Sequence, residues 1–183
     1  MSKAAFKEFI KKGIEEYTHQ KKFDWVGRKN KYLDKVKRLY EQVRSYLQEF
    51  SDTVQLSEET ITVNEKYIGD YEATILKIEI LGKQASLVPV GTNIVGTPGR
   101  VDLKSYLETK RIILVDQNAK EPQIFATIDL NKEDKKRIEK HTEEWATRPR
   151  KYVWKIITDP PNIRYIELDE EHFLGALQEV LGG

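Results

Sequence analysis

The chain has 183 residues, of which 39% are hydrophobic and 33% charged, and it contains no cysteine. This length is enough to bury a hydrophobic core, and the lack of cysteine excludes disulfides, thiolate metal sites and cysteine nucleophiles. The N-terminal segment is charged throughout and lacks the apolar stretch of a secretory signal. No apolar run approaches the roughly 20 residues of a membrane span. We therefore expect a soluble, cytoplasmic protein with no membrane partner.

The charge is unevenly distributed along the chain, although the net charge is only +1. Residues 1–50 hold 13 Lys and Arg against 7 Asp and Glu, whereas the remainder holds 18 against 23. A basic arm of this kind is typical of nucleic-acid contacts. It is equally typical of a helical arm that docks on the acidic part of its own chain or of a neighbour. The composition leaves both interpretations open.

Two helices are predicted before residue 51. In residues 3–20, apolar side chains recur at spacings of three and four, as expected for one face of a helix: Phe6, Phe9, Ile10, Ile14 and Tyr17. A stronger apolar seam predicts a second helix over 29–50: Tyr32, Val36, Leu39, Val43, Tyr46 and Phe50. We expect the two helices to pack together as an antiparallel hairpin; the alternative is that the second seam forms a homodimer.

From Ser51 the composition becomes rich in β-branched residues, which predicts five to seven short antiparallel strands in a bent sheet or a small barrel. Two short strands are expected around a turn at Ser57–Glu59. The alternation of Leu76, Ile78 and Ile80 places these side chains on one face. Pro89 indicates an edge strand or a bulge. Further strands are expected over 111–116 and 123–130.

The C-terminal third is predicted to contain a helix over 131–146, a β-hairpin over 152–168 and a closing helix over 169–181. The hairpin turns at the sequence DPPN, because a Pro-Pro pair does not fit inside a sheet. Asp169 is the expected N-cap of the closing helix. The fold class is therefore α+β: a helical hairpin over 1–51, then an antiparallel β-rich domain over 52–183 that ends in a helix.

The loop around residues 88–103 contains the spacing G-x-x-x-x-G, between Gly91 and Gly96. A phosphate-binding loop of this type continues with lysine and then Ser or Thr, whereas Thr97 and Pro98 follow here. The sequence instead favours a type II turn over Thr97–Arg100, with Gly99 at its third position and 94–95 opposite 101–103 in a hairpin. Arg100 and Asp102 share one strand face, which predicts a local ion pair, although Arg100 is also a candidate for binding an anionic group.

Catalytic patterns are weak. The three histidines lie in separate predicted helices, and the nucleophile motif G-x-S-x-G is absent. Glu108-Thr109-Lys110 resembles the Glu-x-Lys element of restriction-type nucleases, in which Asp102 or Asp70 would supply the other Mg²⁺ carboxylate. We expect no catalytic residue, metal or cofactor, and keep an Mg²⁺-dependent nuclease as the least favoured alternative.

The function that the sequence favours is a non-catalytic interaction module, an accessory subunit of a larger assembly that binds a protein partner or a second copy of itself. The main alternative is nucleic-acid binding through residues 21–38, where basic and aromatic side chains alternate. The simpler interpretation is that Trp25 closes the helical hairpin and the lysines are solvated. The candidate binding residues are Lys21, Lys22, Trp25, Arg28, Lys29, Lys31, Lys35, Arg38 and Arg100.

Overall fold

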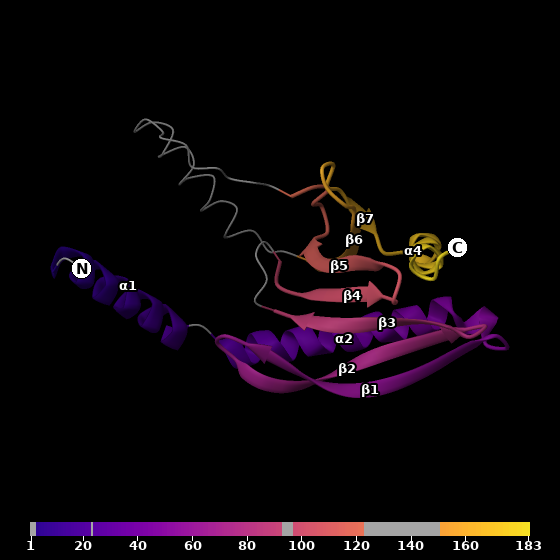
Figure 1. Ribbon diagram of the computed structural model, residues 1–183, viewed down its shortest axis with the longest axis horizontal. Helices are drawn as coiled ribbons and strands as arrows, with labels where there is room; N and C mark the ends of the chain where they lie inside the picture. Colours follow the sequence, from indigo (N-terminus) through magenta and orange to yellow (C-terminus); the bar gives the residue numbers. More distant parts are fainter. Residues whose placement is uncertain (1–2, 23, 93–96, 123–150) are drawn as a thin grey trace.

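A computed structural model describes residues 3–22, 24–92, 97–122 and 151–183 (Figure 1). The described helical elements are α1 (Lys3–Lys22), α2 (Trp25–Tyr46), the short 3₁₀ helix η1 (Gln48–Phe50) and α4 (Glu170–Val180). The strands are β1 (Val54–Glu65), β2 (Gly69–Ile80), β3 (Lys83–Gly91), β4 (Arg100–Lys104), β5 (Thr109–Asp116), β6 (Tyr152–Ile157) and β7 (Tyr165–Glu167).

The seven described strands form one antiparallel sheet in sequence order, from β1 to β7. The α+β class, the antiparallel sheet and the C-terminal helix are therefore confirmed. Of the two predicted forms of the sheet, the barrel is wrong, because the sheet does not close on itself. The strand predicted over 123–130 and the helix predicted over 131–146 lie outside the described residues. The domain boundary at residue 51 stays a prediction.

Helix α2 packs its apolar seam against the sheet. Tyr32, Val36, Leu39 and Val43 are all buried there, in one core with the inward-facing residues of the strands and of α4. Each fully buried aliphatic side chain of this kind contributes roughly 1.5–3 kcal/mol relative to its exposed state. The predicted seam is thus confirmed as an apolar face. Its partner, however, is the sheet and not α1.

The long β1–β2 hairpin corrects one prediction. The expected turn at Ser57–Glu59 is wrong, since these residues pair continuously with Lys77, Leu76 and Ile75 of β2. β1 is an edge strand, and most of its side chains face solvent, so polar residues continue the strand there instead of ending it. The chain turns after Glu65, and Gly69 adopts a positive φ of 80° where β2 begins.

Tyr40 fills the place where β2 and β3 separate. The two strands pair only between Leu76–Ile80 and Lys83–Leu87. Beyond this stretch the Tyr40 hydroxyl lies 2.7 Å from the Thr74 carbonyl oxygen and 2.9 Å from that of Leu87. Its single proton is shared between these two carbonyl oxygens at the end of the paired stretch. Burial raises the pKa of Tyr40, so the hydroxyl remains protonated.

The turn before β4 differs from the predicted type II turn. Such a turn needs a positive φ at its third residue, and Gly99 does not have one. Gly99 is required for a different reason, because a Cβ there would lie 2.6 Å from the ring of Tyr32. The predicted bulge at Pro89 is confirmed by a register shift between Pro89 and Gly91. The pairing predicted for residues 94–95 lies outside the described residues.

The predictions for the β-hairpin and the closing helix agree with the structure. β6 and β7 form the predicted hairpin, and Asp169 caps α4 by accepting a hydrogen bond of 2.9 Å from the His172 backbone N–H. Phe173, Leu177 and Val180 are buried on the face that α4 turns to the core. In the described part of the chain, no helix has both the length and the apolar character needed to cross a bilayer.

Candidate interaction surface

Helix α1 projects away from the sheet (Figure 1), and the large apolar side chains described on it are exposed. Every residue from 4 to 14 is exposed. Four large apolar side chains lie on one face of this segment, and we call them the arm stripe: Phe6, Phe9, Ile10 and Ile14. Phe9 is 68% exposed and Ile14 60%. The predicted packing of the first helix against the second is therefore not seen, although two consecutive helices do precede the sheet.

Trp25 begins α2 and packs against the tip of the β1–β2 hairpin. Asp24 accepts a hydrogen bond of 2.8 Å from the Gly27 backbone N–H, which fixes the first turn of the helix. The ring of Trp25 then stacks on Tyr67, with the two centroids 4.8 Å apart. Arg28 lies 5.9 Å from the same Trp25 ring. We call Trp25, Tyr67, Arg28 and Lys29 the aromatic corner.

A buried carboxylate, Glu65, fixes two of the residues that the aromatic corner contacts, Tyr71 and Thr92. Glu65 accepts hydrogen bonds from the Tyr71 hydroxyl at 2.5 Å, and from the backbone N–H and the hydroxyl of Thr92 at 2.9 and 3.0 Å. Burial raises the pKa of Tyr71, and the hydrogen bond to Glu65 raises it further. Arg28 donates to the Thr92 carbonyl oxygen at 2.5 Å, and Lys29 lies 5.8 Å from the Tyr71 ring. These contacts fix the positions of the Arg28 and Lys29 side chains.

Of the four other predicted binding residues whose side chains the structure describes, three are engaged within the protein. Lys35 donates to the Tyr152 carbonyl oxygen at 3.1 Å, and Arg38 pairs with Asp34 at 3.1 Å. Arg100 binds both oxygens of Asp102, at 2.7 and 2.8 Å, as its sequence spacing predicts. Lys31 is exposed on α2. The side chains of residues 21–22 lie outside the described part of the structure.

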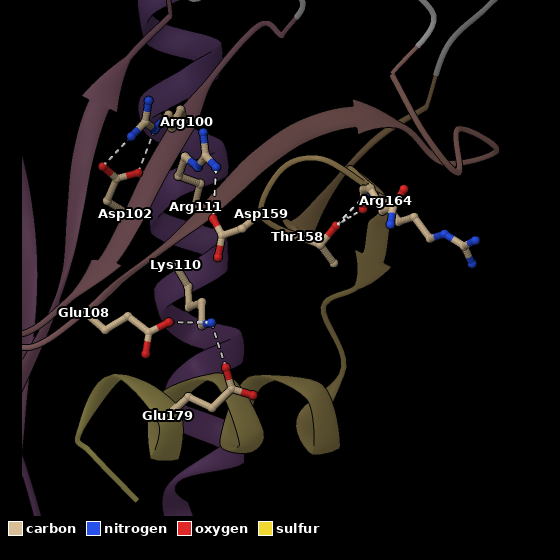
Figure 2. A network of polar contacts seen from close by, with 10 residues as sticks. Arg100, Asp102, Glu108, Lys110, Arg111, Thr158, Asp159, Arg164 and Glu179 are labelled. Atoms are coloured by element: carbon tan, nitrogen blue, oxygen red, sulfur yellow. Dashed lines mark hydrogen bonds and ion pairs between the residues drawn. The ribbon is translucent and has the colours of Figure 1, made fainter.

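Figure 2 shows how the nuclease-like residues are arranged. Lys110 pairs with Glu108 at 2.5 Å and with Glu179 of α4 at 2.7 Å. Hydrogen bonds to these two carboxylates raise the pKa of Lys110. Asp102 is held by Arg100, which lies on the same strand, β4. The Glu-x-Lys motif therefore links β5 to the C-terminal helix, and the described residues contain no group of three acidic or histidine side chains that could hold a metal.

Two features of this surface are not predicted from the sequence. Tyr67 is the partner of Trp25, and its signal was an aromatic residue next to a lysine in the turn between two strands. The second feature is that the apolar face of α1 lies in solvent. Periodicity shows that a helix has an apolar face but does not say what covers it, so this could not be found from the spacing.

Comparison of the chain with known proteins finds no match. No family model matches the chain, and neither a curated protein nor a solved structure shows significant similarity to it.

Proposed function

We propose that the chain is a non-catalytic interaction module, an accessory subunit of a larger protein assembly, in which α1 is the arm that docks on another protein. The observation that carries this proposal is the arm stripe, four large apolar side chains exposed together on one projecting helix. Single exposed apolar residues are ordinary on protein surfaces. A contiguous apolar patch marks an interaction site.

The low stability of an isolated helix also supports a docking role for α1. Isolated helices shorter than about 12–15 residues are marginal in water, and even longer helices, such as α1 with its 20 residues, gain most of their stability in proteins from packing an amphipathic face. α1 has such a face, and Gly13 in the middle of the helix weakens it by up to about 1 kcal/mol relative to alanine. A partner that covers the arm stripe would supply the missing stabilisation.

Nucleic-acid binding through residues 21–38 remains the alternative. It is less well supported, because Arg28 and Lys35 donate to backbone carbonyl oxygens and Arg38 faces a carboxylate. Lys29 and Lys31 are the described candidates to test. Titration with duplex DNA and single-stranded RNA at about 50 mM salt would favour this alternative if binding occurs and is lost in a Lys29→Glu/Lys31→Glu variant.

The docking function is tested by site-specific photo-crosslinking in cells. A photo-reactive phenylalanine analogue replaces Phe9 on the arm stripe, and in a second chain it replaces Asn162, which is exposed in the β6–β7 turn. We expect an adduct of defined mass from position 9 and none from position 162. The adduct should disappear when Ile14→Glu is added, because a charge within the stripe opposes apolar docking.

Equal labelling from positions 9 and 162, or an adduct that Ile14→Glu leaves unchanged, would contradict the proposed function. Mass spectrometry of the adduct identifies the docked protein.

A further inference from the structure

A second apolar surface lies at the end of the molecule opposite α1. It is a groove of about 360 Å³ between the end of α2, the β2–β3 turn and α4. We call it the end groove, and its principal apolar lining residues are Leu47, Phe50, Leu81, Leu174, Leu177 and Leu181. Leu81 is 84% exposed and Phe50 39%. The chain thus exposes an apolar helix face at one end and an apolar groove at the other.

The charges around the two surfaces are complementary. In sequence, α1 carries six lysines and three glutamates. α4, which forms one wall of the end groove, carries three glutamates and no lysine or arginine, and Asp169 precedes it. Of these glutamates, Glu179 is already paired with Lys110 of β5. Glu49 and Asp52 are exposed beside Phe50, whereas the one charged residue of the groove lining itself is Lys83. Opposite charges at the rims favour encounter and orientation of the two surfaces.

The positions of the two surfaces also suit association between copies. α2 separates them, and its 22 residues span roughly 33 Å. When two copies lie side by side in opposite directions, the arm of each meets the groove of the other. This arrangement forms a closed two-fold dimer. The same arm–groove contact is made at both ends, so the arm and the groove of each protomer are covered. A chain that filled its own groove would have to fold α1 back along the whole of α2.

We infer that a second copy of this chain is the partner: the arm stripe of one protomer docks in the end groove of the other, reciprocally. This inference rests on the proposed function, since it names the occupant that the docking arm meets. Amphipathic helices recognise grooves in this way, with side chains spaced by three, four and seven residues as anchors. Phe6, Phe9 and Ile10 have this spacing, and Ile14 continues it.

Cysteine cross-linking tests the contact directly, because the natural chain has no cysteine. Ile10→Cys and Leu81→Cys both alter exposed side chains, so the folded body is undisturbed. Under mild oxidation, we expect a mixture of the two single variants to form a disulfide-linked dimer. Each variant alone should form little, because like positions are far apart in the reciprocal dimer.

A rescue experiment tests the reciprocity. The wild-type protein should have twice the monomer mass of 21.4 kDa by light scattering. Phe9→Glu damages the arm and Leu81→Asp damages the groove, and each should raise the dimer dissociation constant by about tenfold or more. If either charge alone abolishes the contact it enters, each variant by itself retains no arm–groove contact, whereas a mixture of the two retains one, so the mixture should dimerise more tightly than either variant alone. Asn162→Glu, remote from both surfaces, is the matched control.

Four outcomes would overturn the inference. One is an Ile10→Cys dimer alone, which shows arm-to-arm pairing. Another is an internal cross-link within a single chain that carries both cysteines, which shows that the groove takes its own arm. The third is a strictly monomeric wild type with no cross-link. The last is failure of the two damaged variants to rescue each other.

These failures are separable from failure of the proposed function. A photo-adduct from position 9 with a different protein would keep the docking function and remove the second copy as partner. An adduct with the chain itself supports both. No adduct together with a monomeric protein would contradict both.

Discussion

Gly99 and Gly175 differ in the space that is available for a side chain. At Gly99 a Cβ would lie 2.6 Å from Cδ2 of Tyr32 and 3.0 Å from Cδ1 of Leu114. Both side chains belong to the buried core, and the Tyr32 hydroxyl is further fixed by its 2.6 Å hydrogen bond to the Arg100 carbonyl oxygen. At Gly175 of α4, nothing lies within 4 Å of the same atom.

The same substitution should therefore have opposite effects at the two positions. We expect Gly99→Ala to lower the free energy of unfolding by about 1–3 kcal/mol, because the core must shift to admit the methyl group. Gly175→Ala should raise it by about 0.5–1 kcal/mol, because alanine loses less backbone entropy in a helix. Urea unfolding followed by circular dichroism measures both. A stabilised Gly99→Ala protein would show that Tyr32 is not held as described.

At the scale of helices and strands, the sequence correctly predicts those elements whose signal lies within a few neighbouring residues. The α2 seam, the β6–β7 hairpin and the Asp169 cap are each encoded within a few residues, by spacing, by Pro-Pro and by an aspartate before an apolar run. The turn predicted at Ser57–Glu59 failed because an exposed edge strand tolerates the same polar residues as a turn. Strand pairing over a long hairpin is decided by the partner strand, here by Lys77 opposite Ser57.

The Asp169 cap should make the stability of α4 depend on pH. The hydrogen bond from the His172 backbone N–H, followed by the His172 side chain, lowers the pKa of Asp169 below its ordinary value of 3.8. The charged cap therefore stabilises the fold above about pH 4 and loses this effect as the pH falls through the lowered pKa. Asp169→Ala should cost about 1 kcal/mol at pH 7, and this deficit should shrink below about pH 4.

Asp169→Asn separates the charge from the hydrogen bond, because the amide oxygen still accepts from the backbone. Its deficit at pH 7 should be smaller than that of Asp169→Ala. Thermal unfolding of the three proteins between about pH 3 and pH 7 gives the comparison. A deficit for Asp169→Ala that is unchanged across this range would mean that the carboxylate charge contributes nothing to the cap.

The candidate site is only partly predictable from the sequence, because the partners of its residues lie far away along the chain. The basic and aromatic residues of 21–38 are visible in the sequence, but their partners are not. Arg28 binds a carbonyl oxygen of Thr92, which is 64 positions away along the chain, and Lys35 binds one 117 positions away. Whether a lysine is solvated or engaged depends on such distant contacts. Periodicity predicts that the arm stripe is an apolar face, whereas the packing of α1 against the second helix was expected only because the two helices are adjacent in sequence.

At the scale of the whole molecule, the separation of basic and acidic residues along the chain affects how two copies associate. The basic N-terminal fifty residues and the acidic remainder cannot neutralise each other locally at α1, because α1 stands away from the sheet. In the inferred dimer, each basic arm lies against the acidic wall formed by α4 of the other protomer. Charges at an exposed rim are screened within about 10 Å at 0.1 M salt and within about 3 Å at 1 M. Self-association should then respond to ionic strength.

We expect the dimer dissociation constant to rise about threefold to tenfold as NaCl increases from about 50 to about 500 mM, measured by sedimentation equilibrium. The apolar contact persists in salt, so dimerisation should weaken without disappearing. Lys7→Glu/Lys11→Glu on α1 should weaken the dimer at low salt and flatten its salt dependence. Lys151→Glu, exposed at the start of β6, should change neither. A dissociation constant that is independent of salt, or equal loss in both charge variants, would show that rim charges do not orient the arm in the groove.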